Sequence, residues 1–232
     1  MNNLLNDPFE RKAGMALIVF TLLLLCTMGL HPAGGSIEHL IRITNIIVIT
    51  HSIALFSLPL GWIGFWGLTR KIGADHFWSM LAFFMISLGM VAVLIAGATN
   101  GLVLPIFLQH YKDASPEDVA AIKPILRYSF AVNQAFDYVY TAAFCLAVGC
   151  WSVAILFTRR LARWIGWLGI GVTLVIAAVE LAPKSEGRPW SDGGVVAPNT
   201  VQGLRIFIGG IVVWILVVGV ALWKSDGRKS DG

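Results

Sequence analysis

Residues 39–71 read HLIRITNIIVITHSIALFSLPLGWIGFWGLTRK. This stretch is apolar and long enough to cross a bilayer, because a helix needs about 20 mainly apolar residues to span roughly 30 Å of hydrocarbon. Its first half nevertheless carries polar side chains, among them Arg42, Asn45 and His51. Such side chains cost free energy at membrane depth unless they face other helices or a water-filled cavity. The stretch therefore predicts a membrane-spanning helix that lines a polar site.

The composition of the whole chain agrees with a membrane location. Of its 232 residues, 57% are hydrophobic and only 13% are charged, whereas charged residues make up about 25% of an average soluble domain. The mean hydropathy is +0.77. The net charge of +4 comes from short basic clusters beside apolar runs, which is typical of orientation signals. We therefore expect the lipid bilayer as a partner and no nucleic acid.

The chain divides into six apolar runs separated by polar or Gly- and Pro-rich segments. The predicted spans are 13–30, 39–68, 77–104, 125–157, 161–182 and 204–223, with a cytoplasmic N-terminal segment at 1–12 and a disordered cytoplasmic tail at 224–232. This pattern predicts an all-α integral membrane bundle of six transmembrane helices. The first run is longer than the apolar part of a typical signal peptide and lacks a clear cleavage site, so we expect it to stay as a helix. A short surface helix is expected after Ser115, which can cap it.

Basic residues flank the spans on one side. They are Arg11, Lys12, Arg70, Lys71, Arg159, Arg160, Arg163, Lys224, Arg228 and Lys229. An excess of Lys and Arg marks the cytoplasmic side. With six spans, both termini are therefore predicted to be cytoplasmic, and the longer connections at 105–127 and 183–203 face outward.

Several polar side chains then reach the same outer half of the bundle. The candidate ligand-binding residues are Arg42, Asn45, His51, Asn100, Asn133, Gln134, Asp137, Tyr140 and Glu180. Asn133 and Asp137 lie one helical turn apart and share a face. We expect Asp137 and Glu180 to be the ionisable groups of an outward-facing polar cavity, with Arg42 as their countercharge. The alternative for these residues is hydrogen bonding that only holds helices together.

The histidines do not predict a metal or haem site. Zinc needs three or four convergent ligands, and His31, His39 and His110 would meet only if two outer connections fold together. Haem would need two imidazoles at matched depth, and only His51 lies deep. We therefore predict no metal and no cofactor. His51 is either a buried neutral imidazole or a group that handles protons.

Small and aromatic residues indicate packing positions. Gly97-x-x-x-Gly101 and the glycines at 166, 169 and 171 predict faces where helices approach closely. An interfacial aromatic belt near the inner boundary is predicted from Trp62, Trp66, Trp78, Trp151, Trp164 and Trp167.

Two segments resemble a known class of proteins. The hairpin FTRRLARWIGWLGIG at 157–171, and the turn His31-Pro-Ala-Gly-Gly before a histidine-bearing second helix, are similar to those of small bacterial multi-pass membrane proteins of the domain-of-unknown-function type. The resemblance implies a bacterial inner (cytoplasmic) membrane location and carries no activity.

The leading functional hypothesis is a cavity that binds or moves a small polar molecule, ion or proton. A second hypothesis is a non-catalytic membrane subunit or assembly factor, with a membrane-protein partner or a second copy of the chain, whose polar residues only lock helices. A third is an intramembrane enzyme that uses Asp137 or His51 as acid or base. The sequence favours binding over catalysis.

Overall fold

The computed structural model describes residues 8–30, 36–181 and 198–224, and every regular element in these ranges is helical. The elements are α1 (Pro8–Leu30), α2 (Ile37–Arg42), α3 (Thr44–Ile72), α4 (Phe77–Ala98), the π-helical turn η1 (Thr99–Val103), α5 (Leu104–Gln109), α6 (Pro116–Ala121), α7 (Lys123–Thr158), α8 (Arg163–Leu181) and α9 (Pro198–Trp223). The predicted all-α class is confirmed.

Four helical stretches are long and apolar enough to cross a membrane. They are Pro8–Leu30, Thr44–Ile72, Phe77–Gln109 and Glu117–Thr158. Shorter apolar stretches follow at Arg163–Ala178 and Gly209–Trp223. The structure is thus that of a helical membrane protein, while the six-span topology stays a prediction. Most of the predicted terminal segments 1–12 and 224–232 lies outside the described residues, and α1 already begins at Pro8.

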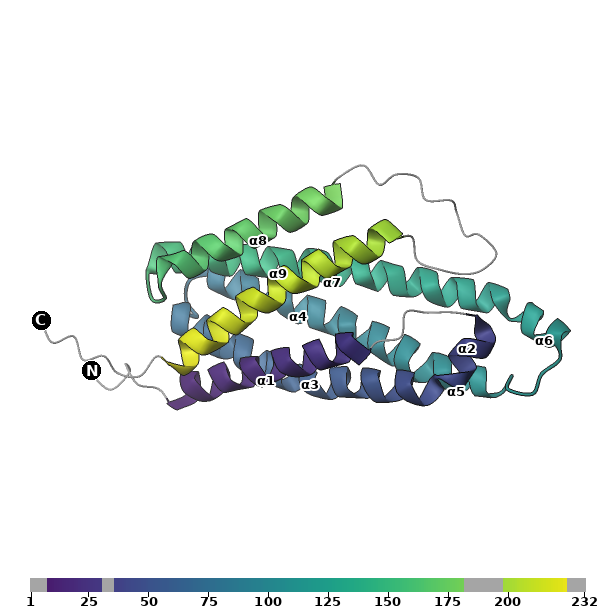
Figure 1. Cartoon of the computed structure of the whole chain (residues 1–232). Coiled ribbons are helices and arrows are strands. Elements are labelled where there is room, and N and C mark those ends of the chain that lie inside the picture. The colour runs from purple at the N-terminus through teal and green to yellow at the C-terminus, as the bar shows by residue number, and fades with distance from the viewer. Residues whose placement is uncertain (1–7, 31–35, 182–197, 225–232) are drawn as a thin grey trace, which may run out of the picture.

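The long helices form an elongated bundle (Figure 1). Helix α1 packs against α3 and α9, and α7 packs against α4 and α8. The first turns of α1 and the last turns of α9 lie at the same end of the bundle, where Gly14 meets the backbone of Gly219 and Trp223. Helices α3 and α7 both run toward this end, so they are parallel to each other (Figure 1).

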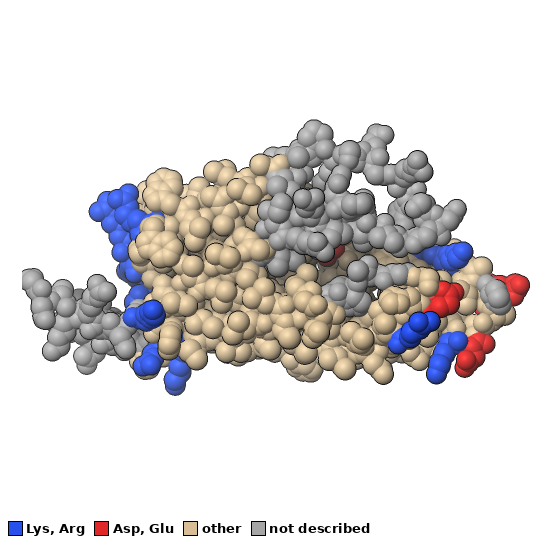
Figure 2. Space-filling model, viewed as in Figure 1, with Lys and Arg blue, Asp and Glu red and all other residues tan. Residues whose placement is uncertain are grey.

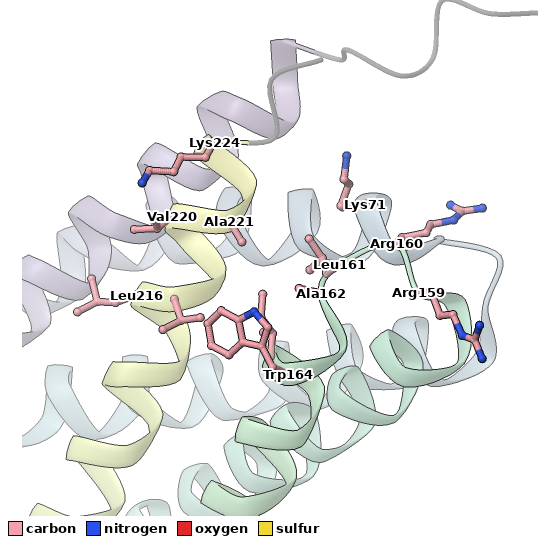
Figure 3. A pocket seen from close by; sticks show the side chains of 12 residues that line it. Lys71, Arg159, Arg160, Leu161, Ala162, Trp164, Leu216, Val220, Ala221 and Lys224 are labelled. Atoms are coloured by element: carbon pink, nitrogen blue, oxygen red, sulfur yellow. The ribbon is translucent and has the colours of Figure 1, made fainter. Parts of the chain in front are cut away.

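Charge is distributed unevenly between the two ends of the bundle (Figure 2). The end where α9 finishes, here called the basic end, carries Arg11, Lys12, Arg70, Lys71, Arg159, Arg160, Arg163 and Lys224. Figure 3 shows four of these side chains from close by. The other end mixes both signs, with Arg42, Lys112, Lys123 and Arg127 beside Glu38, Asp113, Glu117 and Asp118. This asymmetry is what a charge-directed orientation in a membrane requires.

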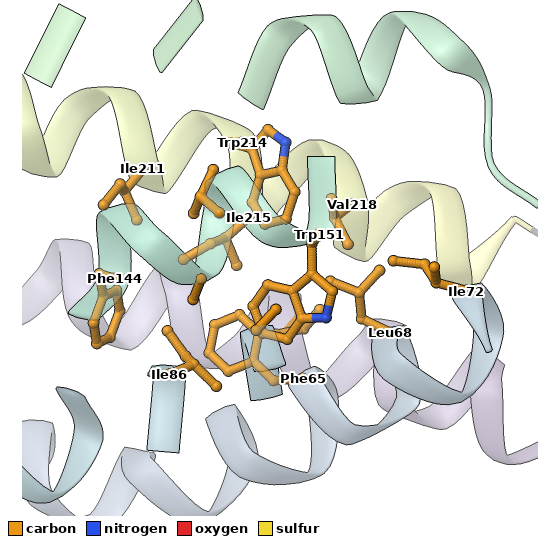
Figure 4. Close-up of a cluster of buried hydrophobic side chains, with 14 of the residues drawn as sticks. Phe65, Leu68, Ile72, Ile86, Phe144, Trp151, Ile211, Trp214, Ile215 and Val218 are labelled. Carbon is orange, nitrogen blue, oxygen red and sulfur yellow. The ribbon is translucent and has the colours of Figure 1, made fainter. Parts of the chain in front are cut away.

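The core near the basic end is built on three stacked aromatic rings (Figure 4). The Trp151 ring lies 5.3 Å from that of Phe65 and 6.2 Å from that of Trp214, with interplanar angles of 16° and 19°. Trp151 Nε1 donates to Thr69 Oγ1 at 3.2 Å, and Trp214 Nε1 donates to the Ile165 carbonyl at 3.1 Å. Both indole N–H groups are thus satisfied inside the core, as buried tryptophans require.

The predicted aromatic belt is wrong for Trp151, which is 0% exposed. Its place on α7 explains the difference, because it continues the inward-facing stripe of Phe144, Ala147 and Val148. Trp78, Trp164 and Trp167 are exposed, as a belt requires.

Two predicted spans are not single regular α-helices in the structure. The second does not begin at residue 39 as one helix, because α2 ends at Arg42 and α3 starts at Thr44. The Thr44 hydroxyl donates to the carbonyls of Leu40 and Ile41 at 3.2 and 2.9 Å and so competes with the regular backbone ladder at this joint. The third span changes into a π-helical turn at Thr99.

The short surface helix expected after Ser115 is present. Helix α6 begins at Pro116, and the backbone N–H of Asp118 donates to Ser115 Oγ at 3.2 Å. A serine cap of this kind satisfies one of the free N–H groups at a helix start.

We predict that Trp151→Ala destabilises the bundle by about 3–5 kcal/mol, because it removes a ring packed on both faces and leaves a cavity. Thermal unfolding of the detergent-solubilised protein measures the effect. The matched control is Trp167→Ala, whose side chain is 60% exposed. Equal losses in both variants would contradict the role of the aromatic stack.

Candidate functional site

A chain of hydrogen bonds connects η1 with α7 and ends on a carboxylate. Ser129 Oγ donates to Asn100 Oδ1 at 3.3 Å. Asn100 Nδ2 donates to Asn133 Oδ1 at 2.7 Å, and Asn133 Nδ2 donates to Asp137 Oδ2 at 3.0 Å. We call these four residues the Asn–Asp network. Along this series from Ser129 to Asp137, each residue donates a hydrogen bond to the next.

The π-helical turn positions Asn100 for this contact. At its start, the Thr99 hydroxyl donates to the carbonyls of Ile95 and Ala96 at 2.8 and 3.1 Å, and Asn100 Nδ2 also donates to the Ala96 carbonyl at 3.1 Å. Side-chain donors that occupy these carbonyls compete with the regular α-helical ladder. Pro105, which follows the turn, has no N–H to continue that ladder. Turns of this kind occur frequently at functional sites.

The His51 side chain of α3 lies directly against the backbone of Gly101 in η1. A Cβ at Gly101 would collide with the His51 side chain, and a Cβ at Gly97 would come within 2.9 Å of Leu55. The predicted close helix approach at Gly97 and Gly101 is thus confirmed. The His51 Nδ1 lies 2.8 Å from the Ile47 carbonyl. A carbonyl can only accept, so Nδ1 carries a proton.

The site residues lie at one level of the bundle. Asp137 precedes the end of α7 at residue 158 by 21 positions, and His51 precedes the end of α3 at residue 72 by 21 positions. Asn100 follows the start of α4 at residue 77 by 23 positions. At 1.5 Å per residue, these separations correspond to about 32–35 Å from the basic end. That is about one hydrocarbon thickness.

Other predicted site residues are not part of the network. Arg42, Asn45 and Gln134 are exposed, and the structure records no ion pair between Arg42 and Asp137. Tyr140 is half-buried, with its ring edge-on to Phe144 at 6.2 Å. The predicted countercharge role of Arg42 therefore has no support in the described contacts.

Two predicted residues cannot be compared with a described side chain. The side chain of Glu180 and the whole of His31 lie outside the described part of the chain. His39 and His110 are both exposed, in α2 and just after α5. Within the described residues, no group of three or more His, Cys, Asp or Glu side chains could hold a metal ion.

Sequence reasoning missed Ser129 and Thr99. Ser129 lies one turn before Asn133 on α7, and Asn133 lies one turn before Asp137, so a search for polar residues at four-residue spacing would have found it. Thr99 has no such signal, because its effect depends on the local shift of the α4 backbone. The grooves recorded in the structure are lined by residues of the basic end, so the outward-facing cavity stays a prediction.

No family model, curated protein or solved structure matches this chain. The function is therefore inferred from the chain's own residues, and the bacterial membrane class suggested by the 157–171 hairpin stays a prediction.

We predict that Gly101→Ala lowers the stability of the bundle by about 1–3 kcal/mol, the usual cost of adding volume to a close-packed contact. The added methyl group would occupy the position of the His51 side chain and push η1 away from α3. Gly171→Ala is the matched control, because a Cβ there meets nothing within 4 Å. It should be neutral or stabilising by up to about 1 kcal/mol through helix propensity. Unfolding temperatures that rise in both variants would show that η1 has room to move.

Proposed function

We propose that this chain is a multi-pass protein of the bacterial cytoplasmic membrane that binds and moves a small polar molecule, ion or proton at Asp137. The observation that carries the proposal is the one-way series of hydrogen bonds that passes through Asn100 of the π-helical turn η1 and ends on the Asp137 carboxylate of α7. A carboxylate in a mainly apolar helix is costly to keep, and such residues typically mark solute or proton pathways.

The geometry at Asp137 supports a bound cation or hydrogen-bond donor. Oδ2 accepts from Asn133, while Oδ1 has no hydrogen-bond partner within the described part of the chain. A carboxylate accepts several hydrogen bonds, so Oδ1 offers a free acceptor. We infer that the ligand contacts this oxygen.

The Asn–Asp network also fixes the orientation of the Asn133 amide. Asn100 donates to its oxygen and Asp137 accepts from its nitrogen, so a flipped amide would set acceptor against acceptor and donor against donor. A site held by such second-layer bonds is preorganised. Neutralising or occupying Asp137 weakens its bond from Asn133 and, through Asn100, changes the contact between η1 and α7. This is how a ligand at Asp137 would move the helices.

The second candidate is a purely structural role. The bond from Asn100 to Asn133 joins two helices, and such bonds typically stabilise a membrane bundle by about 0.6 kcal/mol each without any ligand. This reading corresponds to a non-catalytic membrane subunit, and it makes a different prediction for variants of Asp137.

We predict that Asp137→Asn keeps the fold but loses ligand-dependent stabilisation. The asparagine oxygen still accepts from Asn133, so the network survives while the charge is removed. Thermal unfolding would be compared in sodium, potassium and N-methylglucamine chloride, each at acidic and neutral pH. A ligand at 100 times its dissociation constant stabilises by about 2.7 kcal/mol, and the native protein should show such a shift in at least one condition.

Tyr138→Phe is the control for this experiment, because Tyr138 is an exposed neighbour of Asp137 on α7 outside the network. It should retain the shift of the native protein. If Asp137→Asn and the native protein respond identically to every cation and pH, the structural role is correct and the binding role is wrong.

The proposed orientation of the protein in the membrane can also be tested directly. The native cysteines Cys26, Cys145 and Cys150 are replaced by alanine, and single cysteines are introduced at the exposed positions Lys112 and Lys224. With six spans and cytoplasmic termini, a membrane-impermeant maleimide should label Lys112→Cys in intact cells and Lys224→Cys only after lysis. Labelling of Lys224→Cys in intact cells would overturn this topology.

A further inference from the structure

A groove of about 1140 Å³ opens at the basic end, between α9 and the turn that joins α7 to α8 (Figure 3). Its apolar lining consists of Leu161, Ala162, Trp164, Ile165, Leu216, Val217, Val220 and Ala221. The Trp164 side chain lies between the two walls, and this residue is 57% exposed. The groove is thus an open apolar slot at the end of the bundle, where tryptophans typically meet the membrane boundary.

The mouth of this groove is positively charged. Lys71, Arg159, Arg160 and Lys224 line it, and none of its recorded lining residues is acidic. Lys71 is already compensated, because its Nζ lies 2.8 Å from Glu10 Oε2. Arg159 and Lys224 are exposed and lie on opposite sides of the mouth in Figure 3. Two cations without a recorded acidic partner therefore flank an apolar slot.

Arg160 contributes less to the positive charge of the groove mouth than Arg159 and Lys224 do. A Cβ built on Gly73 would lie 3.1 Å from Asp75 Oδ1 and 3.4 Å from an Arg160 guanidinium nitrogen. The carboxylate and the guanidinium therefore share the space over Gly73. A carboxylate therefore lies near Arg160, whereas Arg159 and Lys224 have no recorded acidic neighbour, so we take these two as the main anion-binding groups of the groove.

The backbone at Arg159 determines which substitution can test its side chain. Arg159 closes α7 with φ 54° and ψ 21°, and it is the one non-glycine residue with positive φ in the described ranges. Glycine or asparagine adopts this left-handed conformation most readily, and other residues pay free energy for it. At this position the left-handed conformation ends α7, with the Arg159 N–H donating to the Ile155 carbonyl at 3.0 Å.

We propose that this groove binds an anionic glycerophospholipid. Its phosphate lies at the positively charged mouth, to which Arg159 and Lys224 contribute from opposite sides, and one acyl chain lies along Trp164, Leu216 and Val220. Arginine suits phosphate because its planar fork matches the phosphate oxygens, and basic pockets between membrane helices are known to hold anionic head groups. A soluble phosphate would fill only the mouth and leave the apolar walls in water, so the slot favours a lipid.

The test measures lipid retention by the full-length protein. The detergent-purified protein is mixed with equal amounts of dioleoyl phosphatidylglycerol and dioleoyl phosphatidylcholine, and bound lipid is counted by native mass spectrometry. The native protein should retain phosphatidylglycerol preferentially. Each basic side chain near an anionic surface contributes about fivefold in affinity. The double variant Arg159→Asn/Lys224→Gln should therefore bind phosphatidylglycerol roughly thirtyfold more weakly.

The choice of variants separates binding from folding. Asparagine tolerates the left-handed backbone at residue 159, so the fold should persist, and an unchanged unfolding temperature in lipid-free detergent checks this. Lys112→Gln/Lys123→Gln removes two exposed cations at the other end of the molecule and should leave phosphatidylglycerol retention as in the native protein.

Three results would overturn the proposal. The first is equal retention of both lipids by the native protein. The second is unchanged phosphatidylglycerol binding in the folded Arg159→Asn/Lys224→Gln variant. The third is thermal stabilisation by glycerol 3-phosphate as large as that by the lipid, because the groove would then hold a soluble phosphate and not an acyl chain.

Discussion

Apolar surface gains little by leaving lipid for another helix, so a bundle in a bilayer depends on close packing and on hydrogen bonds between helices. In this protein, glycine supplies the close packing. Gly61, Gly64 and Gly67 of α3 face Phe20, Leu17 and Ala13 of α1. Elsewhere on α3, Leu55 packs against Gly97 of α4 and His51 packs against Gly101 of η1. Helix α3 therefore touches α1 and the end of α4 at distances that any larger residue would prevent.

These contacts determine where polar side chains can meet. With His51 seated on Gly101, the next residue back, Asn100, bonds to α7 and not to α3. The π-helical turn adds to this effect, because it shifts the residues of η1 relative to the regular face of α4. Packing on one side of η1 and hydrogen bonding on the other thus depend on the same local irregularity.

Much of this arrangement was predictable from single helices. The spacing of Asn133 and Asp137 places both on one face of α7, the small residues at 97 and 101 indicate close approach, and Ser115 indicates a helix start. Each of these signals lies within a few residues of the chain. Patterns of this range were sufficient for the helical class and for part of the Asn–Asp network.

The differences between the predictions and the structure have another origin. Trp151 was assigned to the membrane boundary because tryptophan is common there, yet its burial depends on Phe65 and Trp214 from two other helices. Arg42 stays a predicted countercharge, but it was placed on one continuous second span, whereas the structure interrupts that helix at Ile43. The turn η1 depends on how Thr99, Asn100 and Pro105 compete for backbone groups, which residue spacing does not reveal.

The aromatic stack and the polar site are linked by helix register. Phe65 and Trp151 lie against each other, and α3 and α7 run parallel. His51 precedes Phe65 by 14 residues, and Asp137 precedes Trp151 by the same number. At 1.5 Å per residue, each lies about 21 Å from the stack. The ring contact and the Trp151–Thr69 hydrogen bond therefore hold His51 and Asp137 at one level, although neither touches the stack. A change of one turn in the register of α7 would move Asp137 by about 5.4 Å relative to Asn100, which is enough to break the network. The close packing of the bundle near the basic end is thus what keeps the site at the opposite end assembled.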